Sequence, residues 1–295
     1  MLKVSTFLFL ATLALNAESP EANCGPHALI AKPDFTFAVK TAYRQVEGGF
    51  EITAKNDERY ALHLAIRMEK LTGLESANGT AFVVAVPAGT EIVANTLRLK
   101  KPGTASYFNY HADAYLSHPA EIKPDKSFVY ELPFQPGLAV TILQGYGGKF
   151  SHFNDLNRYA LDFGMPRGTP ILAARAGLVV ASRSDMRWGG HDPALLGTTD
   201  GAGNFVMVLH DDGTVGNYFH MRCGSITLKS GDSVKAGDRL GETGSTGYSH
   251  PDYPHLHFVV RIPDEKNRFG RKTLPTLFRT GTGIIQLKEG QSYEK

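Results

Sequence analysis

This sequence lacks the charge excess that binding to a polyanion requires. Its 295 residues include 31 Lys and Arg against 29 Asp and Glu, a formal net charge of +2 at pH 7. Nucleic-acid binding and anionic-membrane binding draw much of their affinity from clustered positive charge. We therefore expect no nucleic-acid partner.

The sequence also has no apolar run long enough to cross a membrane, which takes about 20 residues. Residues 1–17, MLKVSTFLFLATLALNA, combine a positive Lys3, a short apolar stretch and a small Ala17. This pattern is typical of a cleaved secretory signal peptide. An uncleaved anchor or a buried first helix is the alternative. We expect no membrane span after cleavage, a periplasmic or secreted location, and a monomer.

Cysteine is scarce, with only Cys24 and Cys223. An even pair in an exported chain allows one disulfide that ties the N-terminal region to a distant part of the fold. Two independent thiols are the other reading, because sequence spacing does not place the two Cβ atoms.

A sustained helical period is missing as well, and alternation of apolar residues takes its place between residues 35 and 134. Gly48 and Gly49 are typical of a hairpin turn, and turn residues separate the runs. Alternation of this kind predicts antiparallel strands with one apolar face. We predict a β-sandwich-like domain over residues 18–137. The two clearest runs are Tyr60, Leu62, Leu64, Ile66 and Met68, and Phe128, Tyr130, Leu132 and Phe134.

Beyond residue 137 the strands continue, but glycine becomes dense. The segments GTPILAARAGLVVAS (168–182) and GDSVKAGDRLGETGS (231–245) resemble each other and the half-motifs of barrel-sandwich hybrid folds. We predict an all-β protein in which residues 138–262 form this second domain and residues 263–295 pack on it as an extension.

Seven of the eleven histidines fall between His152 and His257. Within the strand predicted for His255-Leu256-His257, the two imidazoles project from one face, with Cα atoms about 6.5–7 Å apart. This separation allows one ring to bind a metal ion while the other reaches a reacting group. A structural role for such a pair is the common alternative.

Asp162 occupies a similar position in the run RYALDF (158–163). Leu161 and Phe163 would face the core, so Asp162 would lie on the opposite face and need a partner, because an unpaired buried carboxylate is costly. A metal ion would provide that partner. The other reading is an aspartate that opens the following GMPRG turn.

Three segments now carry a family resemblance. SHFNDLNRYALDFGMPRGTPILAARAGLVV (151–180), VLHDDGTVGNYFHM (208–221) and VKAGDRLGETGSTGYSHPDYPHLHF (234–258) resemble, in order, the motifs of the lysostaphin/LytM-type zinc metallopeptidases. The resemblance covers about residues 144–262. It implies a duplicated hybrid motif fold and one Zn²⁺ per chain.

The resemblance also implies roles for individual residues. His152, Asp162 and His257 would be the zinc ligands, while His220 and His255 would be catalytic histidines without a bond to the metal. Tyr146, six residues before His152, would help to stabilise the transition state. The usual His-x3-Asp spacing is His-x9-Asp here, so Asp155 remains an alternative to Asp162.

Three protein ligands leave zinc one open position for water, as in catalytic rather than structural sites. The sequence has no HExxH motif and so no glutamate base of that type. We expect His220 and His255 to share proton transfer and oxyanion stabilisation.

These features predict a secreted zinc metalloendopeptidase that hydrolyses peptide bonds in the stems or crosslinks of bacterial peptidoglycan. The substrate follows from the resemblance and the export signal. The alternative is a catalytically silent LytM-type protein that binds cell wall or activates a hydrolase. A third possibility keeps the enzyme and changes its substrate to an extracellular protein.

Overall fold

The computed structural model describes residues 24, 37, 39–118, 120–195, 199–264 and 271–295. The expected signal peptide, residues 1–17, lies outside this set. Among the described residues, no helix is both long and apolar enough to span a membrane. Helical structure in the same residues is limited to the 3-10 turn η2 (Pro193–Leu195) and the one-turn α1 (Thr199–Ala202). The fold is therefore almost all β, as predicted.

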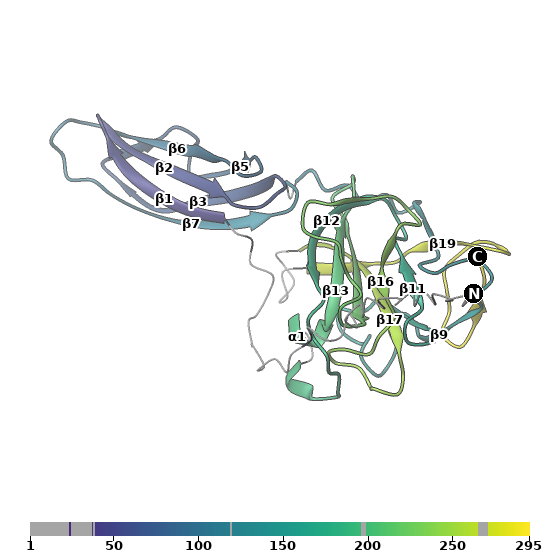
Figure 1. Cartoon of the computed structure of the whole chain (residues 1–295). Helices are drawn as coiled ribbons and strands as arrows, with labels where there is room; N and C mark the ends of the chain where they lie inside the picture. The colour runs from purple at the N-terminus through teal and green to yellow at the C-terminus, as the bar shows by residue number, and fades with distance from the viewer. Residues whose placement is uncertain (1–23, 25–36, 38, 119, 196–198, 265–270) are drawn as a thin grey trace, which may run out of the picture.

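The N-terminal part is a sandwich of two sheets, which extends to one side of the molecule (Figure 1). One sheet has the order β1 (Val39–Val46), β2 (Gly49–Asn56), β6 (Glu91–Leu99) and β4 (Leu74–Ser76). The other has the order β5 (Ala81–Val86), β3 (Leu62–Thr72) and β7 (Tyr107–Tyr115). A tight turn joins β1 to β2, with Gly48 at a φ of 76°.

The alternation along β3 explains how this sandwich closes. Leu62, Leu64, Ile66 and Met68 are all buried, as the period of two predicts. Leu64, Ile66 and Met68 pack with residues of the opposite sheet, such as Leu97, in one apolar cluster.

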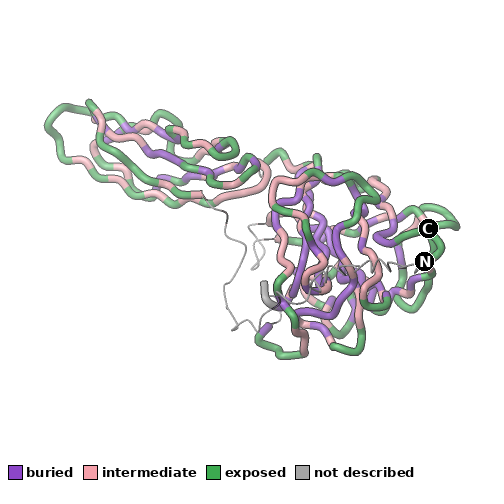
Figure 2. Tube along the Cα trace, in the orientation of Figure 1, coloured by how far each residue is buried: buried purple, intermediate pink, exposed green. Residues whose placement is uncertain are grey.

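The C-terminal part is built on a nine-stranded sheet, and buried residues follow its central strands (Figure 2). Its order is β15 (Ser233–Val234), β12 (Gly177–Arg183), β13 (Asn204–Leu209), β14 (Val215–Met221), β17 (His255–Pro263), β10 (Leu161–Gly164), β9 (Val140–Gln144) and β21 (Ser292–Tyr293), with β18 (Arg271–Leu274) also paired to β17.

The two similar segments found in the sequence pair with each other. β11 (Pro170–Leu172) of the first lies antiparallel to β16 (Arg239–Glu242) of the second. β12 of the first likewise pairs with β15 of the second. This reciprocal pairing is what a duplicated, interlocked motif produces.

The run from Phe128 to Phe134 packs with the C-terminal sheet rather than with the sandwich. β8 (Val129–Glu131) lies parallel to β19 (Leu277–Thr280), which also pairs with β20 (Gly283–Ile285). Tyr130, Leu132 and Phe134 belong to the large C-terminal core. The residues from 271 onwards contribute β18 to β21 to this part of the molecule. The proposed division at residue 137 stays a prediction.

A small apolar contact joins the two parts. Tyr60 and Leu62 pack on Val180 of β12, and the hydroxyl of Tyr60 donates a hydrogen bond of 3.0 Å to the Val180 carbonyl.

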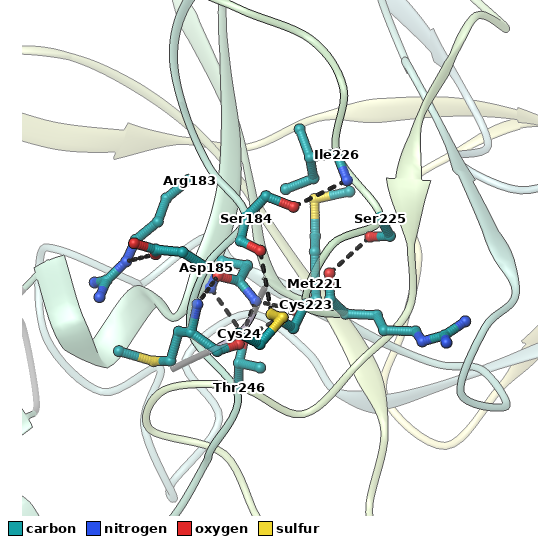
Figure 3. The surroundings of a disulfide bond; sticks show 12 residues. Cys24, Arg183, Ser184, Asp185, Met221, Cys223, Ser225, Ile226 and Thr246 are labelled. Atoms are coloured by element: carbon teal, nitrogen blue, oxygen red, sulfur yellow. Dashed lines mark hydrogen bonds and ion pairs between the residues drawn. A yellow bond between two sulfur atoms is a disulfide. The ribbon is translucent and has the colours of Figure 1, made fainter. Parts of the chain in front are cut away.

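Cys24 and Cys223 form a disulfide, which resolves the choice that the sequence left open (Figure 3). Their Cα atoms are 6.3 Å apart, 199 positions separate them in the sequence, and both are buried. Cys223 follows the end of β14 by two residues, and its Sγ contacts the Ser184 carbonyl at 3.2 Å. The N-terminal region is thus covalently attached to the segment that follows β14, an interior strand of the C-terminal sheet.

Candidate metal centre

Asp162 lies in the middle of β10, between β17 and β9. Strand register places it opposite His257 on one side and Gln144 on the other. Its neighbours Leu161 and Phe163 point into the large core, so alternation directs Asp162 to the other face. Asp162 as a whole residue is 6% exposed.

One carboxylate oxygen of Asp162 contacts two imidazole rings. Its Oδ1 lies 2.9 Å from His257 Nδ1 and 3.3 Å from His152 Nε2, and these two nitrogens are 3.3 Å apart. All three residues are buried, and their ligand atoms lie within 4.8 Å of one another, so the group could hold a metal ion. Ligands about 2.0–2.1 Å from a tetrahedral zinc ion would lie about 3.3–3.4 Å apart. The donor set and its spacing therefore fit zinc.

His152 reaches this position from the loop after β9. Its Nδ1 donates a hydrogen bond of 2.8 Å to the Gly145 carbonyl. The proton on Nδ1 leaves the lone pair of Nε2 directed at the site, the arrangement typical of metal-binding histidines. The ring of His257, in turn, stacks on Phe219 at 5.6 Å.

Gln144 is a residue of this site that the sequence analysis missed. Its Nε2 donates to Asp162 Oδ2 at 2.9 Å, which holds that oxygen and leaves Oδ1 to the histidines. Its Oε1 accepts hydrogen bonds from the backbone N–H groups of Phe150 and Ser151. Gln144 thereby connects the carboxylate to the loop that carries His152. Glycine at 148 leaves room for this side chain, because a Cβ there would lie 2.3 Å from Gln144 Cγ.

His220 and His255 stand beside the three-residue group. Their ring centroids are 4.9 Å apart, and His220 is 5.7 Å from His257. His255 Nε2 lies 3.9 Å from Asp162 Oδ1. The Nδ1 atoms bond the carbonyls of Thr246 and Tyr253, at 2.8 and 2.9 Å respectively. With Nδ1 donating to a carbonyl, Nε2 of each ring is the atom left to face the site.

Burial and mutual contact set the charges of this site. Burial would raise the pKa of Asp162, but His255, His152 and His257 hold it well below its usual range. Burial lowers the pKa of His257 to about 4. Burial, with the nearby His255 and His257, also lowers the pKa of His220. Burial acts in the same direction on His152, but Asp162 outweighs it and raises its pKa. An ionised carboxylate and mostly neutral imidazoles are the forms that bind metal.

The two remaining candidates, Tyr146 and Asp155, are not part of the three-residue group. The hydroxyl of Tyr146 bonds Thr276, including its Oγ1 at 2.9 Å, and the ring packs edge-on against Tyr159. Its catalytic role stays a prediction. Asp155, the alternative to Asp162, is 59% exposed at its side chain and pairs with Arg158 at 3.5 Å.

A groove opens over the histidines. Its floor includes Asp162, His220, His255 and His257. Aromatic rings from separate loops line one part of it and contact one another, namely Phe150, His191, Tyr248, His250 and Tyr253. Asp162 and His257, two of the three residues of the buried group, thus line this groove.

The β-rich C-terminal part thus carries a buried His-Asp-His group that could hold a metal ion, next to a groove. Residues 157–269 match the family model described as Peptidase family M23. The chain therefore carries an M23 peptidase domain, homologous to the lysostaphin and LytM-type endopeptidases. The match includes Asp162, His220, His255 and His257 and begins five residues after His152.

Several proteins of known name are similar in sequence to this chain. The glycyl-glycine endopeptidase ALE-1 of Staphylococcus capitis is 34% identical over 139 residues, 47% of this chain and 34% of that protein. The peptidoglycan DD-endopeptidase ShyA of Vibrio cholerae is 33% identical over 101 residues, 34% of this chain and 19% of that protein. This chain thus matches about a third or less of the length of these relatives. The solved catalytic domain of lysostaphin from Staphylococcus simulans is 31% identical, with 42% of this chain and 78% of that chain covered and a TM-score of 0.30.

Proposed function

We propose that this chain is an exported zinc metalloendopeptidase that hydrolyses peptide bonds in bacterial peptidoglycan. The single observation that carries the proposal is the convergence of His152, Asp162 and His257 beneath an open groove, with two further histidines beside them. The names of the relatives support the reaction and the substrate class. The disulfide supports an oxidising compartment, either the periplasm or the extracellular space.

In the proposed mechanism, His152, Asp162 and His257 hold the metal. When bound, zinc supplies Lewis acidity that activates water and polarises a carbonyl near neutral pH. Gln144 fixes the carboxylate, and the Gly145 carbonyl fixes the tautomer of His152. This pre-orientation keeps the donor atoms in place when substrate enters.

His220 and His255 carry out the proton transfers. Their free Nε2 atoms can take a proton from the attacking water and return one to the leaving amine. The ring that is protonated at that moment also donates a hydrogen bond to the developing oxyanion. Because burial keeps His220 neutral near pH 7, it enters the reaction ready to accept a proton.

Two alanine variants test the assignment of roles. We expect His257→Ala to lose both zinc and hydrolysis of purified cell walls, because it removes a ligand. We expect His255→Ala to lose hydrolysis by at least about 100-fold and to keep zinc. Metal analysis and chromatography of released muropeptides measure the two effects. His111→Ala, an exposed histidine on β7 that pairs with Asp113, is the matched control.

The same assays separate the competing functions. A wild-type protein without bound zinc would favour a catalytically silent wall-binding or hydrolase-activating protein. Cleavage of a glycine-rich extracellular protein, with intact cell walls left undigested, would contradict the proposed substrate.

A further inference from the structure

His220 is the only non-glycine residue at positive φ among the described residues, with a φ of 63°. The left-handed region is sterically unfavourable for a residue with a Cβ and persists where the surroundings enforce it. The side chain of His220 does not hold this conformation through a bond to its own backbone, because its Nδ1 donates to a carbonyl in a different loop. Other residues must therefore hold its backbone.

The unusual backbone belongs to a bulge in β14. Asn204 pairs with Met221, and Val206 pairs with Tyr218, so Phe219 and His220 together stand opposite one residue of β13. Tyr218 and Met221 both point into the large core, whereas Phe219 packs with the separate cluster on the other face. In a regular strand, His220 would share the face of Tyr218. The bulge turns it to the face of His257 instead, a known use of such irregularities.

Thr246 holds the bulge from one side. Its carbonyl accepts the hydrogen bond from His220 Nδ1 at 2.8 Å, and its hydroxyl donates to the Met221 carbonyl at 2.8 Å. The same hydroxyl accepts a hydrogen bond from the Asn204 N–H at 2.9 Å. Thr246 is 2% exposed. One residue thus fixes both the ring of His220 and the peptide that follows it.

Asn204 holds the bulge from the other side. It is fully buried, and its Nδ2 donates to the carbonyls of Met221 at 3.1 Å and Met186 at 2.7 Å. Its Oδ1 accepts from the Met186 N–H. The Met221 carbonyl, which a regular strand ladder would pair with a backbone N–H, therefore receives two side-chain donors. Met221 and Thr246 lie beside the disulfide at Cys223 (Figure 3).

We propose that Thr246 and Asn204 are positioning residues that hold the β14 bulge and so direct His220 toward the metal-binding group. The inference deepens the proposed function and rests on it. Among the residues that the structure describes, no hydrogen bond joins Thr246 or Asn204 to His152, Asp162 or His257. Both act through the backbone at residues 220 and 221.

Thr246→Val and Thr246→Ser provide the test, because valine has the shape of threonine without its hydroxyl, whereas serine keeps the hydroxyl. We expect Thr246→Val to lower kcat on a soluble muropeptide about 10- to 100-fold, with KM and zinc content within about twofold of wild type. Thr246→Ser should stay within about threefold of wild type. Equal kcat for Thr246→Val and wild type would overturn the inference.

A double-mutant cycle separates positioning from general stabilisation. If Thr246 acts through His220, Thr246→Val should cause no further loss of kcat in a His220→Ala background. A further loss of the same size there would overturn the inference. If Thr246→Val does not fold, Thr246→Cys, which replaces the hydroxyl with a weaker thiol donor, enters the same cycle.

A crystal structure of Thr246→Val makes the inference independent of activity. We expect the ring of His220 to move away from His255 and its φ to leave the left-handed region. An unchanged His220 would overturn the inference even if the wild type proved inactive. An inactive wild type with bound zinc would instead contradict the proposed function.

Discussion

A single buried glutamine, Gln144, donates a hydrogen bond to one oxygen of the carboxylate in the candidate metal centre. Because Gln144 holds Asp162 Oδ2 and the loop before His152, we expect Gln144→Ala to weaken zinc affinity about 10- to 100-fold. Competition with a chromogenic chelator measures the change. Gln135→Ala, an exposed glutamine in the preceding turn, should match wild type. Equal affinities for the two variants would show that Gln144 has no such role.

His210 is another buried histidine, and it lies outside the metal centre. Its Nδ1 donates to the Ala176 carbonyl at 2.9 Å, while its Nε2 is buried without a hydrogen-bond partner among the residues that the structure describes. Burial lowers its pKa from 6.5 to about 4. The neutral form is therefore favoured in the folded state, and the unfolded chain binds the extra proton between these two pH values.

This shift predicts a pH dependence of stability. The contribution of His210 is complete above pH 6.5 and declines as the pH falls toward 4, by about 3 kcal/mol in total. Urea unfolding of wild type and His210→Gln between pH 7.5 and 4.5 measures it. We expect the slope of unfolding free energy against pH to be smaller in the variant. Parallel curves would contradict the assignment to His210.

The residues that alternate along strands were the ones the sequence could predict. His255 and His257 lie two apart, so a period of two places them on one face, and the structure brings both to Asp162. Gln144 offered no such signal, because glutamine is not a typical metal ligand and it is 18 residues from Asp162. The bulge at His220 was also out of reach, since it depends on hydrogen bonds from Asn204 and Thr246, which lie in other elements.

At the scale of elements, local patterns predicted strands but not their partners. Phe128 to Phe134 alternate like the strands of the sandwich, yet β8 pairs with β19, about 150 residues later. Only the register of distant strands decides which core an apolar face joins. The two resembling segments were more informative, because each glycine-bounded half supplies strands that complete the other.

The contact between the sandwich and β12 gives a prediction at this scale. We expect Tyr60→Phe to lower the unfolding free energy by about 1 kcal/mol, since it removes the hydroxyl bond to Val180 and leaves the ring packing intact. Calorimetry measures the loss. Tyr107→Phe, on an exposed ring of β7, is the matched control. A Tyr60→Phe protein as stable as this control would mean that the hydroxyl bond contributes nothing.

For the whole molecule, the disulfide is the strongest single constraint. Because 199 positions separate its cysteines, its removal frees a long loop in the unfolded chain, and we expect Cys24→Ser to destabilise the protein by about 2–5 kcal/mol. Thermal unfolding with and without reductant measures the loss. Reductant should lower the Tm of wild type and leave that of the Cys24→Ser/Cys223→Ser double variant unchanged. If reductant left the Tm of wild type unchanged, this expectation would be contradicted.

The same bond closes residues 24–223 into a covalent ring that contains the entire sandwich. A protease that cuts this ring once, anywhere along the sandwich, opens it without separating the pieces. The nicked protein would keep its mass on a gel until a reductant is added. Release of the N-terminal sandwich therefore needs two cuts, or one cut together with reduction.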